Sequence, residues 1–381
     1  MRVLHIMSGY GGGISSFIRN KAEAMRSHQV VFDVVTYDVC ADAFVAAIQA
    51  TGGEVYQLLN PKQHGWRAFV QSLSKVLAAQ SYDAVHCHIS GYRVIPYALL
   101  CRKFRVGAFY IHAHYTLEKQ GISLSLQLNQ WINRHFSQAK LGCSDDAVRS
   151  IYGWQTADEE LMVIPNSIDV QQYQYTPERY RRLRRNVRQQ YQIADDVQLV
   201  GQIGRLTPIK NHALTLQLAT QAQQEKAPIR FLIVGAGELD EVLRREVAQL
   251  HLEEYVFFTG RVEPIAALYP ALDALIMPSF REGLPTVVVE SQAAGVPVVM
   301  SETITDEVDL QLNLVHKCAL NHVEDWYEQL RLLPQQSRPM AEERLAMIEQ
   351  QKFSNEASAQ LYVDFLTGKV THYRIIGGGH S

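Results

Sequence analysis

Two glutamates on either side of position 285 flank a predicted helix start and could bind the hydroxyl groups of a ligand. The sequence places Gly283 and Pro285 just before a helical run. The free N–H groups from Leu284 to Thr286 and the positive end of the helix dipole would suit a phosphate. Glu282 precedes this helix and Glu290 lies inside it, so their carboxylates would be roughly 8 to 10 Å apart. Because like charges repel, they would bind hydroxyl groups beside a phosphate. A helix-capping Glu282 and an ordinary helical Glu290 would have the same spacing.

Two cations follow a predicted strand further up the chain. The strand ends near Gly204, and Arg205 and Lys210 precede the next helix. Arginine offers a rigid fork for two oxygens and lysine a compact charge, so this pair suits a phosphate. An exposed loop with two surface cations would show the same pattern.

The elements that must position these residues follow an alternating pattern. Short apolar runs alternate with longer amphipathic segments, as in the strands and crossover helices of a parallel α/β sheet. In the first half we predict strands at Val3 to Met7, Val30 to Thr36, Ala84 to His88, Ala108 to His112 and Lys140 to Cys143. In the second half we predict strands at Leu199 to Ile203, Ile229 to Val234, Val256 to Thr259, Ala274 to Met277 and Val296 to Val299.

The two halves meet at a strand end with turn residues, Val163 to Asp169, before a polar tract. We therefore expect two domains. Residues 1–170 form the first together with 355–381, whose final helix crosses back to it. Residues 171–354 form the second.

Composition excludes several classes of protein. The chain has 381 residues, of which 47% are hydrophobic, enough for two cores. A formal net charge of −3 gives no field that would attract a nucleic acid. The 5 cysteines are never in a CxxC pair, so neither a disulfide framework nor a zinc site is indicated. No secretory leader or membrane span is evident, and a reducing cytoplasm fits best.

Several motifs, in family order, resemble the retaining glycosyltransferases of family GT4, which have the GT-B fold. The resemblance rests on Gly204-Arg205-Leu206 with Lys210-Asn211-His212, on the Glu282/Glu290 pair and on the hinge Ile164 to Asp169. Further matches are Gly11 to Gly13, Leu232 to Gly237, Phe258 to Arg261 and Ala293 to Val299. The hinge carries Ser167 where the family usually has glycine, which suggests a slightly altered turn.

The resemblance implies two facing Rossmann-like domains with a cleft between them, the first on the acceptor side and the second binding the donor. It implies a retaining, metal-independent hexosyl transfer from a nucleotide-sugar, such as a UDP-sugar, to a glycan or lipid-linked saccharide. Capsule or exopolysaccharide synthesis is the branch that it resembles most. Such an enzyme would be cytoplasmic, with peripheral contact to the inner membrane surface, and would need no cofactor or metal.

Residue roles follow from the same resemblance. Glu290 would hold the ribose hydroxyls and Glu282 the sugar hydroxyls. Arg205 and Lys210 would clamp the diphosphate and stabilise the charge that grows on it. The remaining donor-binding residues would be Gly12, Gly13, Gly204, Gly235, Gly237, Arg261, Gly283, Leu284, Pro285 and Thr286.

Four histidines end two of the predicted strands. His86 and His88 follow one strand and His112 and His114 the next, at the sheet edge where open α/β folds bind ligands. We assign His86 and His88 to the acceptor side, although buried structural histidines would fit equally. Similar GT4 enzymes carry a histidine next to the transferred sugar, which implies a catalytic role for His112 or His114. We expect strand alternation to turn these two to opposite faces, so that only one contacts the sugar.

Other functions would fit two α/β halves. A nucleotide-dependent dehydrogenase needs Gly-x-Gly-x-x-Gly, but Ile14 and Asp240 stand where the third glycine belongs. A GT-B sugar-nucleotide 2-epimerase and a non-catalytic GT-B partner subunit remain open. Product analysis without an acceptor would reveal the epimerase.

Two amphipathic segments could contact a membrane. Residues 178–191 carry six arginines, together with Tyr180, Leu183, Val187 and Tyr191 at helical spacing. This pattern suits either anionic lipid or an ordinary charged outer face. Residues 122–136 carry Leu124, Leu128, Trp131, Ile132 and Phe136, which suit the membrane, the acceptor or the core.

Overall fold

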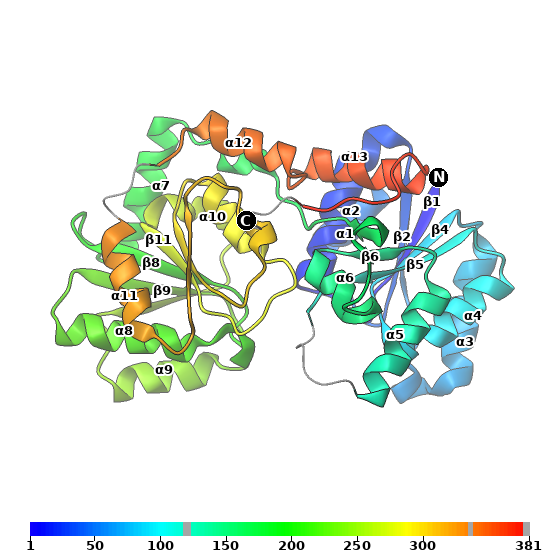
Figure 1. The fold of residues 1–381 in the computed structure, drawn as a ribbon, viewed down its shortest axis with the longest axis horizontal. Helices are drawn as coiled ribbons and strands as arrows, with labels where there is room; N and C mark the ends of the chain where they lie inside the picture. Colours follow the sequence, from blue (N-terminus) through cyan, green and yellow to red (C-terminus); the bar gives the residue numbers. More distant parts are fainter. Residues whose placement is uncertain (117–122, 334–337, 376–381) are drawn as a thin grey trace. The chain divides into compact units, whose positions relative to one another are not determined.

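A computed structural model describes residues 1–116, 123–333 and 338–375. Within these residues the chain divides into two compact units (Figure 1). Unit 1 comprises Met1–Ile168 and continues from Lys352 to Ile375, and unit 2 comprises Asp169–Gln351. Residues 376–381, which we assigned to the first domain, lie outside the described residues, as does residue 122 of the second amphipathic segment.

Unit 1 is built on a parallel sheet of seven strands in the order β3-β2-β1-β4-β5-β6-β7. The order reverses between β1 and β4, which is where open α/β sheets bind ligands. The strands are β1 (Arg2–Ile6), β2 (Val31–Thr36), β3 (Val55–Gln57), β4 (Ala84–Cys87), β5 (Ala108–Ala113), β6 (Lys140–Gly142) and β7 (Leu161–Val163).

Helices cover both faces of this sheet. On one face α1, α2 and α13 pack against alternate strand residues such as Val3, Phe32 and Ala84. Neighbouring side chains along a strand point to opposite sides of the sheet, so only every second residue of a strand packs against these helices. The helices of unit 1 are α1 (Gly13–Ala24), α2 (Asp42–Gln49), α3 (Pro61–Ala79), α4 (Ile95–Lys103), α5 (Leu124–Phe136), α6 (Asp145–Tyr152) and α13 (Asn355–Leu366).

The C-terminal helix α13 lies directly beside α1, as Figure 1 shows and as their contacts confirm. Its position is fixed where the chain re-enters unit 1, because Ile168 donates its N–H to the carbonyl of Phe353 at 2.8 Å and accepts from Asn355 at 3.0 Å. The residues that leave unit 1 and those that return to it are therefore hydrogen-bonded neighbours.

Unit 2 repeats the same architecture with six parallel strands in the order β10-β9-β8-β11-β12-β13. The order again reverses beside the first strand, here between β8 and β11. The strands are β8 (Gln198–Ile203), β9 (Ile229–Val234), β10 (Val256–Gly260), β11 (Ala274–Met277), β12 (Val298–Ser301) and β13 (Val315–Cys318).

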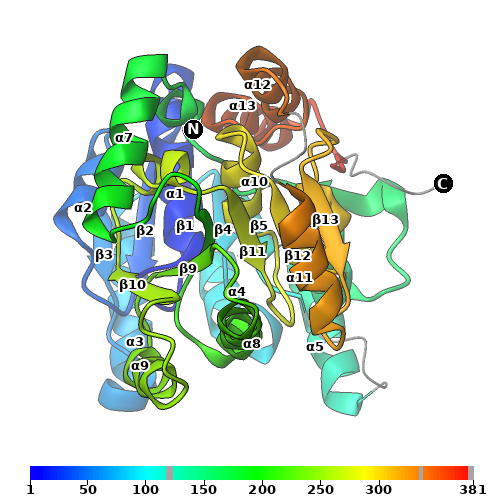
Figure 2. The same ribbon diagram turned by 90° about the vertical axis from the view of Figure 1, so that its left-hand side faces the viewer.

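The helices of unit 2 sandwich this sheet (Figure 2). Side chains of α8, α9 and α11 share one apolar cluster with the strands. Helix α10 packs against β11 and β12, and α12 packs against α10. The helices are α7 (Pro177–Gln190), α8 (His212–Gln224), α9 (Asp240–Gln249), α10 (Thr286–Ala293), α11 (Val323–Leu332) and α12 (Ala341–Gln350). No helix within the described residues is long and apolar enough to cross a membrane.

All ten predicted strands are present, and every one begins and ends within two residues of its predicted ends. The largest shift is at β12, which begins at Val298 rather than Val296. Three strands at or near a sheet edge, β3, β7 and β13, were not predicted as separate strands. Each has only three or four residues, too few for a clear apolar run.

Candidate active site

The carboxyl ends of β8, β9, β10 and β11 place the predicted donor-binding residues of unit 2 along one sheet edge. Because all four strands are parallel neighbours, the loops that follow them emerge side by side. The amide of Gly204 donates to Val234 O at 2.9 Å, and that of Gly235 donates to Gly260 O at 2.9 Å. The exposed Arg261 follows directly. The structure thus brings together residues from three separate motifs.

Two glycines allow these loops to touch. A Cβ at Gly235, where φ is +142°, would lie 1.9 Å from the carbonyl oxygen of Gly204. A Cβ at Gly237 would lie 2.3 Å from the carbonyl oxygen of Leu206. Backbone cannot move away from a side chain as another side chain can, so both positions require glycine.

Lys210 and Glu282 form an ion pair at this edge. Lys210 Nζ lies 2.7 Å from Glu282 Oε1, and each side chain is 16% exposed. The loops that carry them are joined by a hydrogen bond from the Phe280 amide to Ile209 O at 2.9 Å. Lys210 also lies over Gly204, where a Cβ would come within 3.1 Å of its Cε. The ammonium therefore neutralises a carboxylate at the position where we expect a phosphate.

Arg205 differs from Lys210 in having no such partner. Its side chain is exposed, and its guanidinium forms no hydrogen bond or ion pair with any described residue. It is the loop cation most available to a ligand.

A buried glutamine on the preceding strand forms a hydrogen bond to the backbone of Lys210. Gln202 on β8 is 3% exposed, and its amide donates to Lys210 O at 2.8 Å. Thr215 of α8 donates to Gln202 Oε1 at 2.6 Å, which fixes the amide orientation. Lys210 is thereby held by the strand it follows and by the next helix.

Glu290 lies in an apolar and aromatic setting on α10. The Tyr269 hydroxyl donates to Glu290 Oε2 at 3.0 Å, and the ring of Tyr173 lies 5.8 Å from that of Tyr269. Burial raises the pKa of Glu290 above its ordinary value, while hydrogen bonds from Tyr269, Thr286 and Tyr173 act in the opposite direction. The carboxylate is held in place at an energetic cost.

The remaining donor-binding residues lie at the two predicted helix starts. Helix α10 begins at Thr286, with Pro285 at its N-cap and Gly283 and Leu284 just before. Gly12 and Gly13 open α1 in unit 1, where Gly12 has φ +74°. Helix α1 follows β1 and helix α10 follows β11, and each of these strands lies next to the point where the strand order of its sheet reverses.

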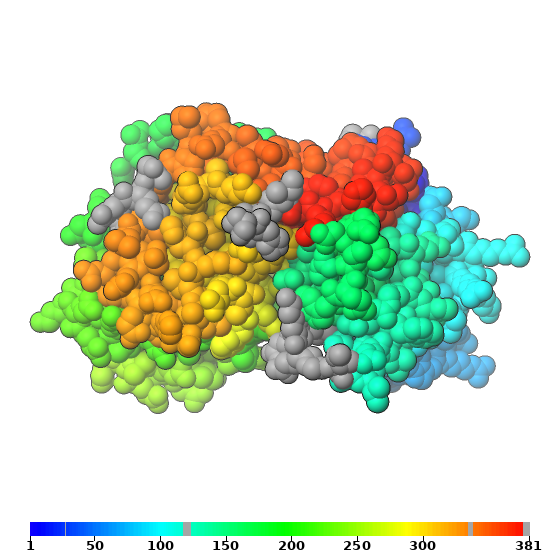
Figure 3. All heavy atoms as spheres, in the orientation of Figure 1, coloured from blue at the N-terminus to red at the C-terminus, as the bar shows by residue number. Residues whose placement is uncertain are grey.

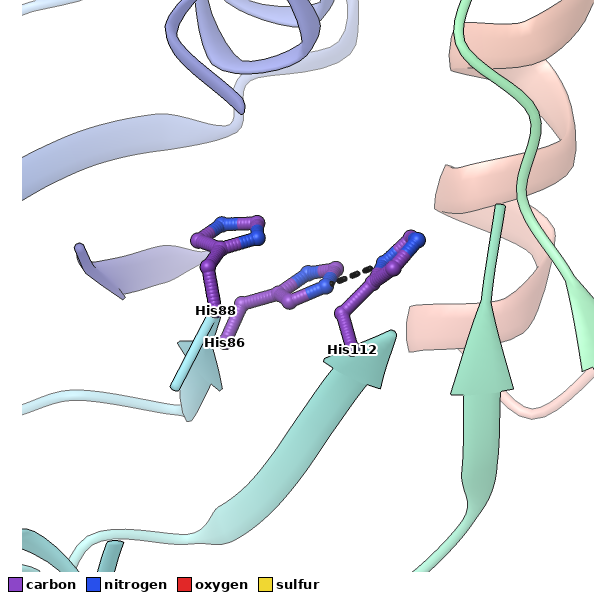
Figure 4. Close-up of side chains that lie close together, drawn as sticks. All are labelled: His86, His88 and His112. Atoms are coloured by element: carbon purple, nitrogen blue, oxygen red, sulfur yellow. Dashed lines mark hydrogen bonds between the residues drawn. The ribbon is translucent and has the colours of Figure 1, made fainter. Parts of the chain in front are cut away.

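The predicted histidines gather at the corresponding edge of unit 1, and a fifth joins them. His5 of β1 lies beside His86 in the strand register. The rings stack across three adjacent strands, with centroids 5.2 Å apart for His5 and His86 and 4.9 Å apart for His86 and His112. Figure 4 shows His86, His88 and His112 extending from the ends of β4 and β5.

His112 and His114 lie on the same face, so the expectation that they point to opposite faces was wrong. Their rings stack 4.3 Å apart with an interplanar angle of 11°. Alternation has a period of two, so residues two positions apart share a face. His112 is 1% exposed, whereas His114 is only partly buried.

Hydrogen bonds join the imidazoles into two chains. In the first, the Tyr362 hydroxyl lies 2.5 Å from His86 Nδ1, and His86 Nε2 lies 2.7 Å from His112 Nδ1. In the second, His5 Nδ1 lies 3.1 Å from His88 Nε2, and His88 Nδ1 lies 2.6 Å from His114 Nε2.

Both chains end in ring nitrogens without partners. Within the described part of the chain, His112 Nε2, His5 Nε2 and His114 Nδ1 are buried and form no hydrogen bond. Burial lowers the pKa of His86 and His112 well below the ordinary value, so these rings are neutral near pH 7.

Helix α1 covers the histidines with one aromatic ring and one buried cation. Phe17 meets four of the imidazoles edge to face, the nearest being His112 at 4.9 Å between ring centroids. Lys21 is 0% exposed and donates to Ser358 Oγ at 2.6 Å, Pro165 O at 3.2 Å and Ser167 Oγ at 3.3 Å. Ser167, the departure from the family hinge, is thus a partner of a buried lysine.

The histidines have ligand atoms that a metal could use. Those of His86, His88 and His112 lie within 4.8 Å of one another. However, 2.7 Å between His86 Nε2 and His112 Nδ1 is a hydrogen-bond distance. Two nitrogens around tetrahedral zinc, with Zn–N of ~2.0–2.1 Å, would be about 3.3 Å apart. The rings as placed bind one another rather than surround an ion. That the reaction needs no metal stays a prediction.

Comparisons with known proteins match one family model to each of the two units. The model for "Glycosyl transferase 4-like domain" matches residues 12–167, within unit 1, and that for "Glycosyl transferases group 1" matches residues 184–308, within unit 2. The chain belongs to the GT4-like glycosyltransferases.

Two similar proteins match this GT4-like glycosyltransferase over almost the whole chain. EpsF of Bacillus subtilis, which carries the name of a glycosyltransferase, is 29% identical over 371 residues, 95% of this chain and 93% of its own. HepE of Anabaena, solved with UDP-glucose, has 20% identity and a TM-score of 0.79, covering 97% of this chain and all of its own. This likeness shows the GT-B fold. A Campylobacter jejuni protein is 39% identical over 94 residues, 24% of this chain and 26% of its own. Its name describes an N-acetylgalactosaminyltransferase acting on an undecaprenol-diphosphate-linked saccharide.

Two arginines of the glycosyltransferase's α7 are structural rather than part of a charged outer face. Arg188 is 2% exposed and binds Asp273 Oδ2 at 3.1 Å, and Arg184 binds Asp273 Oδ1 at 3.0 Å. Arg181, Arg182 and Arg185 are exposed.

Helix α5 exposes most of the apolar residues that we singled out. Leu124 is 84% exposed, Leu128 56% and Trp131 55%, whereas Ile132 is buried. Core packing therefore explains Ile132, while Phe136 is partly buried. Figure 3 shows the atoms of α5, in teal, on the visible surface of unit 1.

Proposed function

We propose that this chain transfers a sugar from a UDP-sugar to a saccharide or lipid-linked saccharide in surface polysaccharide synthesis, with retention at the anomeric carbon and without a metal. The observation that carries this proposal is the gathering of Arg205, Lys210, Glu282 and Glu290 around one sheet edge of unit 2. The name of the Campylobacter transferase supports the acceptor class, and the HepE complex supports the donor class.

The unit 2 edge would hold the nucleotide part of the donor. Arg205 and Lys210 would bind the diphosphate, and Glu290 the ribose hydroxyls. Lys210 would bind a phosphate oxygen and Glu282 at once, so that Glu282 can bind sugar hydroxyls without repelling the phosphate.

The reaction would need no separate base. The bond between the anomeric carbon and the diphosphate oxygen breaks, and the acceptor oxygen bonds to the same face of that carbon. The departing phosphate oxygen takes the acceptor's proton. The cations then supply most of the catalysis, since they stabilise the charge that grows on the leaving group.

We propose that α5 rests on an anionic membrane surface. Its exposed Leu124, Leu128 and Trp131 follow the spacing of one helix face. The exposed Tyr92 and Arg93 belong to a short helix that packs against α5. An apolar stripe beside a cation suits the boundary of anionic headgroups and acyl chains.

The central experiment combines nucleotide binding with transfer. UDP-glucose and UDP-N-acetylgalactosamine are titrated in a thermal-shift assay, since a ligand of the folded state raises apparent stability. Transfer to an undecaprenol-diphosphate-linked saccharide is then followed with and without EDTA, and the anomeric configuration of the product is read by NMR. Stabilisation, unchanged activity in EDTA and an α-linked product from the α-linked donor are expected. Donor conversion without acceptor would instead identify an epimerase, and binding without transfer would favour a non-catalytic subunit.

Membrane contact is tested separately by co-sedimentation with vesicles. Phosphatidylglycerol vesicles should retain the protein and phosphatidylcholine vesicles should not. The double variant Leu128→Ser/Trp131→Ser should lose retention. Leu332→Ser, an equally exposed leucine of α11, is the matched control and should keep it. Equal retention of both variants would contradict the role of α5.

A further inference from the structure

A phenol on the C-terminal helix lies at the closed end of the first imidazole chain. Tyr362 of α13 is 0% exposed, and its hydroxyl lies 2.5 Å from His86 Nδ1. Among the described residues that hydroxyl has no other hydrogen-bond partner. His86 Nε2 lies 2.7 Å from His112 Nδ1, and the chain ends at His112 Nε2, which is buried and has no hydrogen-bond partner among the described residues.

The hydrogen bonds of this chain can be donated in only two directions, either from Tyr362 toward His112 or from His112 toward Tyr362. A neutral imidazole has one N–H and one bare nitrogen. If Tyr362 donates, His86 carries its proton on Nε2 and donates to His112 Nδ1, so His112 carries its proton on Nε2. If the chain runs the other way, His112 Nε2 is bare. Each direction makes two hydrogen bonds and leaves one donor without a partner.

Two features favour donation by Tyr362. An O···N distance of 2.5 Å is short for an N–H donor, for which ~2.9–3.0 Å is usual, and O–H donors form shorter hydrogen bonds than N–H donors. A phenol is also the better donor and an imidazole nitrogen the better acceptor.

We infer that Tyr362, acting through His86, fixes His112 as the tautomer with its proton on Nε2. His112 then presents a neutral N–H donor toward an oxygen of the bound sugar or phosphate, and it does not act as a base. Tyr362 and His86 are positioning residues in this scheme. The role toward the donor substrate rests on the proposed function, whereas the tautomer itself does not.

The second chain is an internal control. His5, His88 and His114 are linked in the same way, but no phenol or other fixed donor lies at either end among the described residues. Nothing in this chain selects one direction, so His114 should not depend on Tyr362.

The test is nitrogen NMR of protein with ¹⁵N-labelled histidine at pH 7.5, with His112 assigned from a His112→Gln variant. In the wild-type protein His112 should show its proton on Nε2. In Tyr362→Phe, which removes only the hydroxyl, both directions become equivalent and His112 should show both tautomers. Tyr110→Phe, whose hydroxyl has no partner among the described residues, is the control and should match the wild type, as should His114 in every variant.

Activity supplies an independent reading. The transfer rate of Tyr362→Phe should fall about two-fold for an even mixture, in proportion to the competent population. Adding UDP-glucose should return His112 to the Nε2–H form. A wild-type His112 protonated on Nδ1, or a tautomer unchanged in Tyr362→Phe, would overturn the inference while leaving the proposed transfer intact. Absence of transfer together with the expected tautomers would overturn the proposed function alone.

Discussion

The ligand-binding edges of the two sheets share a topology but differ in charge. In unit 2 the edge carries Arg205, the Lys210–Glu282 ion pair and Glu290. In unit 1 the edge carries five imidazoles, four of which are in ring contact with Phe17. Burial keeps these imidazoles neutral, as the lowered pKa of His5, about 3, shows. One edge is therefore equipped to hold a charged ligand, and the other offers oriented dipoles.

This difference indicates how the proposed work is divided. A diphosphate needs compensating positive charge, whereas a sugar needs hydrogen bonds of defined direction. Charge at the unit 1 edge would be costly, because four of its five histidines are at most 8% exposed. At the unit 1 edge, the direction of each hydrogen bond to a ligand would instead be set by which nitrogen of a neutral imidazole carries the proton.

The largest expected effect comes from removing charge at the unit 2 edge. Arg205→Met and Lys210→Met should each lower kcat by about 10²–10³, the range for losing one group that stabilises transition-state charge. Arg331→Met, an exposed arginine of α11, is the control. Steady-state kinetics decide the matter, and losses below about five-fold would show that the charged edge does not act on the leaving group.

Glu290→Gln should weaken nucleotide binding by about ten-fold, since a charge-assisted hydrogen bond contributes roughly 1.5–3 kcal/mol. The unliganded variant should nevertheless gain stability. Burial raises the folded-state pKa of Glu290, so its contribution to stability is present below the ordinary value of 4.5 and is lost as pH rises. Isothermal titration with UDP and thermal unfolding at pH 5 and 7 measure both effects. A variant less stable than wild type at pH 7 would contradict the cost that we assign to the buried carboxylate.

The two edges also differ in how much of them could be predicted from the sequence. The unit 2 residues stand in short motifs of charged and glycine residues, so type and spacing identify them. Gln202, Tyr173 and Tyr269 escaped prediction because a single amide or phenol carries no such pattern. In unit 1 four histidines could be named from strand ends. The partner that orients them could not, since Tyr362 lies 276 residues from His86 and belongs to an ordinary amphipathic helix.

A comparable, roughly ten-fold difference is expected between two variants of His112, and it tests whether this residue acts as a hydrogen-bond donor or as a base. Glutamine places an amide N–H near the position of Nε2–H, whereas asparagine mimics Nδ1–H. His112→Gln should therefore stay about ten-fold more active than His112→Asn, if one N–H donor is what the reaction needs. Equal activity of the two variants, measured at saturating donor, would show that the position of the N–H is unimportant.

The smallest effect on activity is expected from Lys21, whose ammonium supports the edge from behind. Burial lowers its pKa from 10.5 to about 7. Between these values the unfolded chain binds a proton that the folded chain does not, so wild-type stability should rise with pH by up to about 1.4 kcal/mol per unit. Lys21→Met lacks this term, whereas the exposed Lys62→Met keeps it. Urea unfolding at pH 7, 8 and 9 should therefore show a wild-type advantage over Lys21→Met that grows with pH. A stability difference that does not change with pH would mean that Lys21 stays charged in the folded protein. Its ammonium would then be stabilised by its three oxygen partners, which belong to Pro165, Ser167 and Ser358. A positive charge would then lie behind the imidazoles and would favour their donor tautomers electrostatically.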